Sequence, residues 1–196
     1  PWLAESWERS EDGLTWTFNL REGVMFSNGR EMTAEDVKWS WERLINPETG
    51  SGNAARVGPP ETVIEAVDTY TVSVTHPEPF GIFPQSIGFD KSSGIMAPES
   101  VGDDGTVQVP IGTGPFMITE VEGTTRLLLE RNPYYWQEGL PYLDAVEITP
   151  IPDDHPNDGT RSPVPCAPAH IPWRRPRGPG AKGRRRPPPG RRRATS

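Results

Sequence analysis

Residues 14–20 read LTWTFNL, a strict alternation of apolar and polar side chains. A period of two is typical of a strand that buries one face, so we expect a half-buried β-strand here. Turn-forming residues precede it at 10–13, and residues 3–7 are placed to pair back across that turn as a hairpin. A second reversal is expected at 27–30, where the sequence reads SNGR. These features predict that a sheet begins near the start of the chain.

A helix is predicted shortly after that reversal. Thr33 suits the N-cap because its hydroxyl can accept from the amide of Asp36, and acidic residues favour the positive end of a helix. The helix should end near Ile45, because the following Asn46-Pro47 pair disfavours further helical conformation. Apolar residues at helical spacing form the expected core face: Ala34, Val37, Trp41, Leu44 and Ile45. Trp41 is therefore interpreted as a core residue.

More strands than helices are expected in the rest of the chain. Residues 62–67 and 70–75 alternate around Asp68-Thr69, which suits a short hairpin connection. Residues 50–60 are interpreted as a loop and 80–89 as a short helix or loop. Three further strands are expected at 116–121, 126–130 and 145–149. The predicted fold class is therefore mixed α/β of the α+β type.

Charge divides the chain into two chemically different parts. Residues 1–154 hold nine Lys and Arg against twenty-six Asp and Glu, a net charge of −17. Residues 155–196 hold eleven basic residues against one acid, a net charge of +10, and are rich in proline and glycine. The first part suits a soluble folded protein. The second offers too little apolar surface for a core, so we expect a disordered tail.

Cysteine content and hydropathy exclude some classes of protein. The single cysteine, Cys166, lies in the basic tail, so no intramolecular disulfide or multi-cysteine metal site is expected. The sequence has no run of about 18 apolar residues that would span a bilayer, and no export signal is visible at its start. The opening residues, Pro1-Trp2, are those of a mature or truncated product.

Six motifs occur in a fixed order along the chain. They are LAESW at 3–7 followed by DGLTWTFNLREGV at 12–24, FSNGR at 26–30, TAEDV at 33–37, VDTYTV at 67–72, GTGPF at 112–116 and ERNPYYW at 130–136. Together they resemble the family 5 solute-binding proteins, the dipeptide, oligopeptide and nickel binders that serve ABC importers. Each motif is short, and the specificity of the resemblance comes from their order.

The resemblance implies a fold and a function. Residues 1–154 would be the N-terminal part of the solute-binding domain, a partial lobe of the type II periplasmic-binding-protein architecture. The intact parent would capture a peptide or similar small solute in the periplasm or another extracytoplasmic space, with lipoprotein anchoring as one option. It would deliver the solute to ABC permease subunits, act as a monomer, and need neither catalysis nor a cofactor. This part alone is not expected to be competent for transport.

The resemblance ends where the basic tail begins. At His155 family members would continue with a helix rich in alanine and leucine, whereas this chain changes to arginine, proline and glycine. GC-rich codons encode those three residues, so residues 155–196 are interpreted as an out-of-frame translation. An alternative function class remains open, in which the basic tail makes the chain a nucleic-acid or surface-binding protein through counterion release.

No catalytic or metal-binding residue is predicted, and the ligand-binding residues are left unassigned. Gly112-Thr113-Gly114 lacks the Gly-Lys-Ser/Thr of a phosphate-binding loop and precedes a strand, so a tight backbone passage is expected there. His76 and Glu78 lack metal-ligand spacing and are interpreted as solvated surface. The acid pairs Glu11-Asp12 and Asp103-Asp104 lie in turn-like contexts without a nucleophile.

Overall fold

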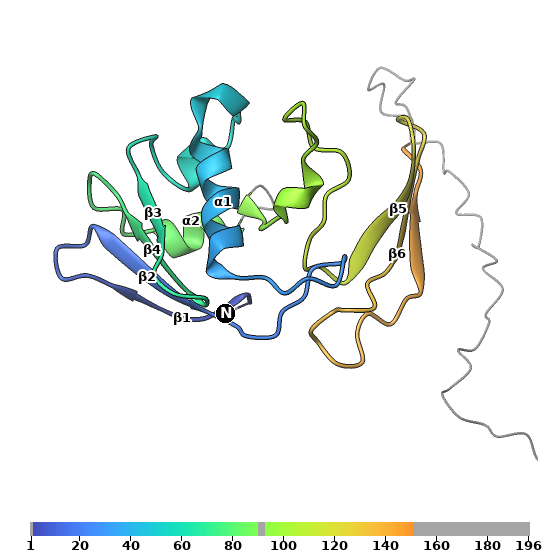
Figure 1. Cartoon of the computed structure of the whole chain (residues 1–196), viewed down its shortest axis with the longest axis horizontal. Helices are drawn as coiled ribbons and strands as arrows, with labels where there is room; N and C mark the ends of the chain where they lie inside the picture. Colours follow the sequence, from blue (N-terminus) through green and yellow to red (C-terminus); the bar gives the residue numbers. More distant parts are fainter. Residues whose placement is uncertain (1, 90–92, 151–196) are drawn as a thin grey trace, which may run out of the picture. The chain divides into compact units, whose positions relative to one another are not determined.

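The computed structural model describes residues 2–89 and 93–150, and the predicted tail lies outside the described residues (Figure 1). Its elements are β1 (Ala4–Arg9), β2 (Thr15–Leu20), α1 (Ala34–Ile45), the 3₁₀ helices η1 (Pro47–Thr49) and η2 (Ala54–Arg56), β3 (Val63–Ala66), β4 (Thr71–Thr75), α2 (Phe83–Phe89), the 3₁₀ helix η4 (Pro98–Ser100), β5 (Phe116–Glu122), β6 (Arg126–Arg131) and β7 (Ala145–Ile148). The predicted α+β class is confirmed.

β2 lies inside a four-stranded antiparallel sheet whose strand order is β1-β2-β4-β3. Phe18 on β2 pairs with Trp7 on β1 and with Val72 on β4. Burial along β2 follows the apolar and polar alternation of the sequence, because Trp16, Phe18 and Leu20 are buried while the intervening residues are not. Both predicted hairpins, β1–β2 and β3–β4, are confirmed.

Helix α1 packs against this sheet, with contacts to β3 and β4. Its N-terminus forms a capping box, in which the Asp36 carboxylate accepts from the Thr33 amide at 2.8 Å and from the Thr33 hydroxyl at 3.2 Å. Trp41 is buried, as expected for a core residue, and Leu44 is partly buried. The predicted helix and its core face are confirmed.

Aromatic rings fill the space between the sheet and the two helices. Phe83, on α2, is fully buried, and its ring centroid lies 5.7 Å from that of Phe18 and 5.9 Å from that of Trp41. Its ring meets His76 at 4.6 Å in an edge-on arrangement. Edge-on aromatic pairs add to the gain from apolar burial, so this cluster joins sheet, α1 and α2 into one core.

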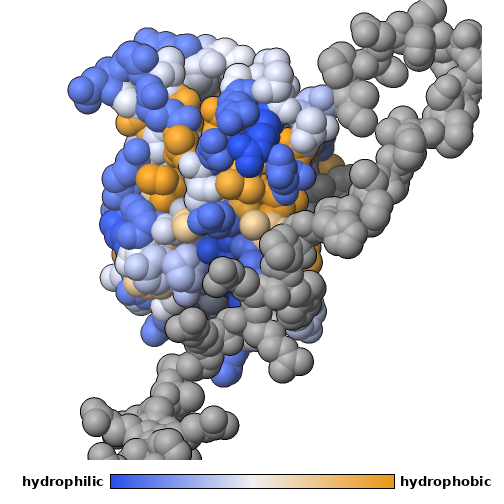
Figure 2. Space-filling model, turned by 90° about the vertical axis from the view of Figure 1, so that its right-hand side faces the viewer, coloured by the Kyte–Doolittle hydropathy of each residue, from blue (hydrophilic) through white to orange (hydrophobic). Residues whose placement is uncertain are grey.

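The second sheet, β5-β6-β7, is antiparallel and amphipathic. Directly paired residues project from the same face, which groups seven apolar side chains on one face: Phe116, Ile118, Val121, Leu127, Leu129, Val146 and Ile148. The opposite face carries Arg126, whose guanidinium bonds the carboxylates of Glu120, Glu122 and Glu147. Figure 2 looks from the side of this sheet and shows apolar side chains gathered among charged ones. Within the described residues, none of the seven belongs to the main core cluster.

The predicted loop at 50–60 holds a structure that periodicity missed. Residues 54–56 form the 3₁₀ helix η2, which is closed by a hydrogen bond from the Val57 amide to the Ala54 carbonyl at 3.0 Å. A 3₁₀ helix of three residues is too short to show a repeat in the sequence. The segment is therefore more ordered than its glycine and proline content indicates.

Arg30 joins the turn at 27–30 to the start of α1, six positions on, and to η4, which is far away in sequence. Its guanidinium donates to the Asp36 carboxylate at 2.7 and 3.0 Å and to the Glu99 carboxylate at 2.8 and 3.0 Å. Its Cζ atom lies 5.0 Å from the ring centroid of Phe26. These contacts connect the turn at 27–30 to the start of α1 and to η4.

Replacing Arg30 with methionine is expected to lower the free energy of unfolding by about 2 kcal/mol. An exposed ion pair stabilises a protein by less than about 1 kcal/mol, whereas leaving a buried charge without its partner costs about 3–5 kcal/mol. The expected value lies between these limits because the Asp36 side chain is only 5% exposed while the Arg30 side chain is 38% exposed. Urea denaturation followed by circular dichroism measures the change. Arg9→Met, at an exposed arginine, serves as the control and should change stability by less than about 0.5 kcal/mol. Equal stability of the two variants would contradict the role given to Arg30.

Glu99 gives the chain a specific pH dependence. Its hydrogen bond from Arg30 holds the pKa of the Glu99 carboxyl below its ordinary value of 4.5. A group with a depressed folded pKa stabilises the fold above its unfolded pKa, and that stabilisation is lost as the pH falls through the folded value. Wild type should therefore lose more stability than Arg30→Met when the pH is lowered from 7 to about 3. Denaturation curves at both pH values check this, and a larger loss in the variant would refute it.

Candidate functional site

Two of the sequence motifs meet at a junction around Asn132. The Asn132 side chain, which is buried, donates to the Gly114 carbonyl at 2.8 Å and accepts from the Tyr134 amide at 2.9 Å. The backbone amide of Asn132 donates to the Pro115 carbonyl at 2.9 Å. The GTGPF and ERNPYYW motifs are thus tied together through one asparagine. The glycines at 112 and 114 do not make the passage tight, because a Cβ atom on Gly112 would meet no atom within 4 Å and one on Gly114 would come no closer than 4.0 Å to the Phe116 carbonyl oxygen.

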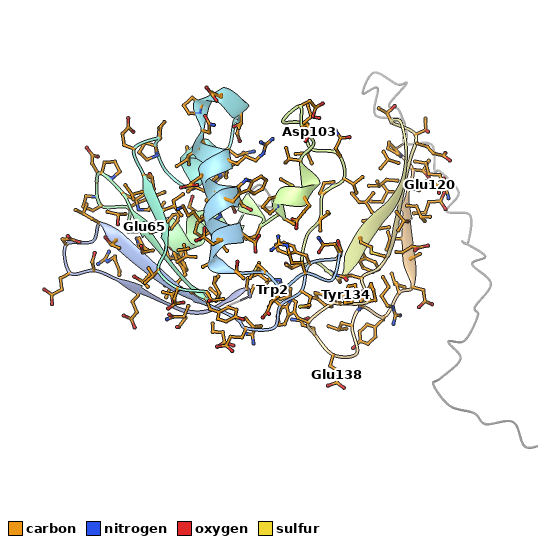
Figure 3. The ribbon with its side chains drawn as sticks, viewed as in Figure 1. Trp2, Glu65, Asp103, Glu120, Tyr134 and Glu138 are labelled. Atoms are coloured by element: carbon orange, nitrogen blue, oxygen red, sulfur yellow. The ribbon has the colours of Figure 1, made fainter. Side chains whose placement is uncertain are left out.

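The same junction contacts the turn after β2. The Ser27 amide donates to the Gly112 carbonyl at 2.9 Å. Gly29 has φ +84°, and a Cβ atom there would lie 3.1 Å from the ring of Tyr134, whose side chain is labelled in Figure 3. Glycine is required at this position by both the left-handed backbone and the close ring.

Beside the junction is a polar cavity of about 430 Å³, lined by Glu5, Leu20, Arg21, Glu22, Gly23 and Trp136. The guanidinium carbon of Arg21 lies 4.9 Å from the ring centroid of Trp136, and Trp2 meets the same indole edge-on at 5.6 Å. Arg21 also pairs with the Glu5 carboxylate at 3.0 Å. The cavity therefore combines an aromatic ring, a cation and two carboxylates.

Hydrogen bonds to Glu31 fix the backbone at Gly23, one of the residues that line this cavity. One oxygen of the Glu31 carboxylate accepts from the Gly23 amide at 2.8 Å and from the Tyr70 hydroxyl at 2.9 Å. The hydrogen bond to Glu31 raises the pKa of the Tyr70 phenol above its ordinary value of 10.0. These bonds fix the backbone that carries Arg21 and Glu22.

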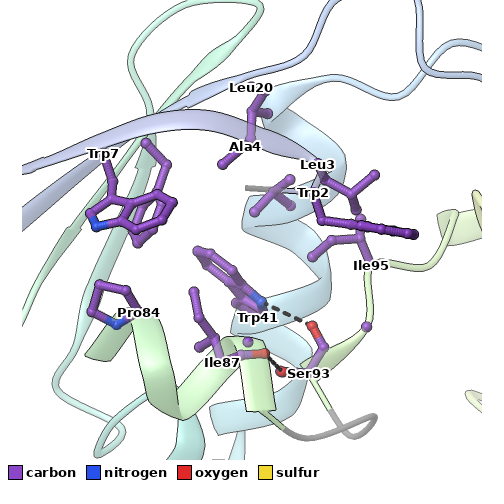
Figure 4. Close-up of a pocket in the computed structure, with 14 residues that line it drawn as sticks. Trp2, Leu3, Ala4, Trp7, Leu20, Trp41, Pro84, Ile87, Ser93 and Ile95 are labelled. Atoms are coloured by element: carbon purple, nitrogen blue, oxygen red, sulfur yellow. Dashed lines mark hydrogen bonds between the residues drawn. The ribbon is translucent and has the colours of Figure 1, made fainter. Parts of the chain in front are cut away.

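A second, apolar cavity of about 620 Å³ lies between β1, β2 and the two α-helices (Figure 4). Trp2, Trp7 and Trp41 are among its lining residues. Two of its polar groups are already used, because Trp41 Nε1 donates to the Ser93 carbonyl and the Ser93 hydroxyl donates to the Ile87 carbonyl. Ligand sites need convergent polar groups that set orientation, so the polar cavity at Arg21 is the better candidate site.

His76 was expected on the solvated surface, and that expectation is wrong. The side chain is 3% exposed, its Nε2 atom lies 2.8 Å from the Val57 carbonyl oxygen, and its ring packs on Phe80 and Phe83. The alternation of β4 continues to position 76, which places the ring on the core side. Glu78 is exposed, as expected.

One residue of each acid pair, Asp12 and Asp104, stabilises a turn by accepting hydrogen bonds from residues that follow it. Asp12 accepts from the Leu14 amide at 3.0 Å, and Asp104 accepts from the Thr106 amide at 3.0 Å. Hydrogen bonds from the Ser10 hydroxyl and then the Leu14 amide lower the pKa of Asp12, and those from the Thr106 hydroxyl and then its amide lower the pKa of Asp104. Among residues 2–89 and 93–150, no group of three or more His, Cys, Asp or Glu side chains is arranged to hold a metal ion. Neither helix in this part is long and apolar enough to cross a membrane.

The sequence left the binding residues unassigned, and the structure brings Arg21 and Trp136 together. Arg21 lies in the DGLTWTFNLREGV motif and Trp136 in the ERNPYYW motif, and they are too far apart in sequence for any local pattern to pair them. Their proximity follows from the contact between the two motif regions.

Comparison with known proteins decides the family. A family model described as bacterial extracellular solute-binding proteins, family 5 middle, matches residues 1–158. The chain belongs to this family. Members of the family 5 solute-binding proteins are binding proteins rather than enzymes.

Individual relatives agree with this assignment. The glutathione-binding protein GsiB of Salmonella typhimurium is 33% identical over 157 residues, covering 78% of this chain and 30% of the relative. A nickel ABC transporter structure from Bacillus halodurans is 39% identical, with a TM-score of 0.63, covering 76% of this chain and 29% of that one. The Haemophilus influenzae OppA complex with the peptide RPPGFSPFR is 26% identical, with a TM-score of 0.63, covering 76% and 33%. This family 5 chain thus spans about a third of the length of the relatives it matches.

Proposed function

We propose that the chain is the N-terminal part of the substrate-binding component of an ABC importer, and that the intact parent captures peptides or similar small solutes for transport, whereas this part alone is not competent. The observation that carries the proposal is the family 5 match across residues 1–158. The agreement in fold with the nickel and peptide-binding structures supports it. The whole chain would act by binding, with no chemical conversion of the solute.

Peptide-like ligands are favoured by two observations. GsiB is named for glutathione and OppA was solved with a nine-residue peptide, whereas nickel appears in the name of the Bacillus relative. In addition, the polar cavity at Arg21 is lined by a guanidinium and two carboxylates, which are groups that can pair with peptide termini. We therefore place peptides before metal chelates.

Partners and location follow from this role. The solute would be captured in the periplasm or another extracytoplasmic space, and passed to ABC permease subunits in the membrane. The binding protein would act as a monomer, since an importer takes up one loaded carrier at a time. Fractionation of the producing cells tests the location, and recovery of the protein with cytoplasmic markers would refute it.

We also propose that residues 1–154 and 155–196 have different origins, the first as the N-terminal part of the solute-binding domain and the second as an out-of-frame tail. The change of composition at His155 and the end of the family match at residue 158 support this division. Sequencing the coding DNA through codon 155 tests it. An alternative frame that resumes the family pattern would support the proposal, and an intact frame in close relatives would refute it.

Uptake measurements test the function directly. Deleting the full-length, in-frame gene in the native bacterium should abolish or strongly reduce uptake of labelled di- and tripeptides. A plasmid copy of that full-length gene should restore uptake, whereas a plasmid that encodes only this 196-residue chain should not. A panel that includes glutathione and nickel separates the ligand classes. Unchanged uptake of every solute in the panel would refute the proposal.

A further inference from the structure

Three asparagine side chains among the described residues accept a hydrogen bond from the backbone amide two positions further along the chain. The three pairs are Asn28 with Arg30 at 3.0 Å, Asn46 with Glu48 at 2.9 Å, and Asn132 with Tyr134 at 2.9 Å. A turn of this kind folds the side-chain amide back over the following peptide unit. The side-chain carbonyl carbon is therefore held close to the backbone nitrogen of the next residue.

The next residue decides whether that nitrogen can react with the side chain. Asn46 and Asn132 both precede a proline, whose backbone nitrogen carries no hydrogen to lose. Asn28 precedes Gly29, which has an N–H group and no side chain to hinder its approach. Asn28 is also exposed to water. Of these three turns, the turn at Asn28 alone brings together an amide carbon that can be attacked and a nitrogen that can attack it.

Two Asp-Gly turns have the same geometry but a different charge. Asp12 accepts from the Leu14 amide and Asp104 from the Thr106 amide, each at 3.0 Å. A carboxyl group is ionised at neutral pH, and an anionic carboxylate is a poor target for a nucleophile. The neutral amide of Asn28 has no such protection.

The hydrogen bond from Arg30 favours the attack. When the Gly29 nitrogen attacks Cγ of Asn28, negative charge develops on Oδ1, the atom that accepts from the Arg30 amide. A donor that already points at the atom where charge develops lowers the barrier of the reaction. The turn therefore holds the amide in place and stabilises the charge that the reaction creates.

Two other contacts hold the same turn closed. The Gly29 amide donates to the Phe26 carbonyl at 2.9 Å, so its nitrogen must leave this bond before it can attack. In addition, the ring of Tyr134 lies so close to Gly29 that a Cβ atom there would come within 3.1 Å of it. The turn has to open locally for the reaction to proceed, and the neighbouring ring opposes that opening.

We propose that Asn28-Gly29 is a site of spontaneous deamidation and isomerisation, and that the Tyr134 ring limits its rate. The Gly29 nitrogen loses its proton and forms a bond to Cγ of Asn28, and the bond from Cγ to the side-chain nitrogen breaks and releases ammonia. Water then opens the resulting succinimide at either of its two carbonyl groups, which gives aspartate or isoaspartate. The site is independent of the proposed transport function.

The isoaspartate product changes the backbone of the turn. It places one additional methylene group in the main chain between Asn28 and Gly29, which shifts Gly29 relative to the Tyr134 ring. It also disturbs the hydrogen bond from the Phe26 amide to the Arg30 carbonyl, which is 2.8 Å long. Modification should therefore loosen the contact between this turn and the ERNPYYW motif.

Peptide mapping of the full 196-residue chain tests the site. The folded chain is incubated at mildly alkaline pH and digested with trypsin, which releases residues 22–30 with Asn28 and residues 10–21 with Asn19. Asn19 lies in β2 before Leu20 and is the internal control. The peptide 22–30 should gain about 1 Da, at least about tenfold faster than the peptide 10–21. Labelling by an isoaspartate methyltransferase should identify isoaspartate in the peptide 22–30. An unchanged mass of this peptide, or equal rates for the two peptides, would overturn the proposed site.

Two tyrosine variants test the role of the ring. Tyr134→Ala should accelerate the mass gain of the peptide 22–30 at least about threefold, because the turn opens more readily without the ring. Tyr142→Ala, at a tyrosine that is 86% exposed, should leave the rate unchanged. Circular dichroism of both variants separates this local effect from unfolding of the chain. Equal rates in wild type and a folded Tyr134→Ala would overturn the control by the ring.

Discussion

Replacing Phe83 with alanine is expected to remove about 3–5 kcal/mol from the free energy of unfolding. Phe83 is fully buried and lies at the centre of the aromatic cluster, with ring contacts to Phe18, Trp41 and His76. Truncation removes its apolar burial and leaves a cavity between the sheet and both helices. Since domains of this size are stable by about 5–15 kcal/mol, the variant should unfold at much lower urea concentration.

The neighbouring residue provides a matched control. Ile82 precedes Phe83 and is 64% exposed, so Ile82→Ala should change stability by less than about 0.5 kcal/mol. Urea denaturation followed by far-ultraviolet circular dichroism measures both variants. Similar unfolding midpoints for Phe83→Ala and Ile82→Ala would contradict the central role of the aromatic cluster.

Asn132→Ala is expected to destabilise the chain by about 1–3 kcal/mol. The substitution leaves the Gly114 carbonyl without its donor and the Tyr134 amide without its acceptor. Asn132 is buried but Gly114 and Tyr134 are exposed residues, so water can partly replace these two bonds and each contributes about 0.5–1.5 kcal/mol. The lost hydrogen bonds connect the GTGPF and ERNPYYW motifs, so the substitution should also allow Trp136 to move from its position next to Arg21.

Asn28→Ala separates this effect from the general loss of an asparagine. Asn28 is exposed and accepts one hydrogen bond, from the Arg30 amide at 3.0 Å, which water can replace. Its replacement should cost less than about 1 kcal/mol. Denaturation curves give the stability of both variants, and the indole NMR signal of Trp136 reports its surroundings. An unshifted Trp136 signal in Asn132→Ala would show that the junction does not position the cavity.

Local patterns predicted most of the regular elements. The alternation at 14–20 and the capping signal at Thr33 are complete within a few residues, and both elements appear where expected. His76 was misjudged because the lack of metal-ligand spacing was the only ground for placing it on the solvated surface, whereas it is the last inward position of the β4 alternation. Short 3₁₀ helices such as η2 have no periodic signal to detect.

The candidate site could not be predicted from the sequence, for a physical reason. Arg21 and Trp136 come from different motifs, and their contact depends on how the segments between them fold. The Arg30 contact to Glu99 spans 69 positions and has the same origin. The residue types were visible in the motifs, but which of them share a cavity is a property of the tertiary structure.

The strand order has a consequence for the route by which the chain folds. β5, β6 and β7 pair with their neighbours in sequence, so that sheet closes only short loops. In the other sheet β2 pairs with β4, and everything from the turn at 27–30 to β3 must be enclosed before that pairing forms. Pairings with high contact order form slowly because the entropy of loop closure is lost before the contacts are gained. The three-stranded meander should therefore acquire its hydrogen bonds first, and protection of the β2 and β4 amides from exchange should develop later.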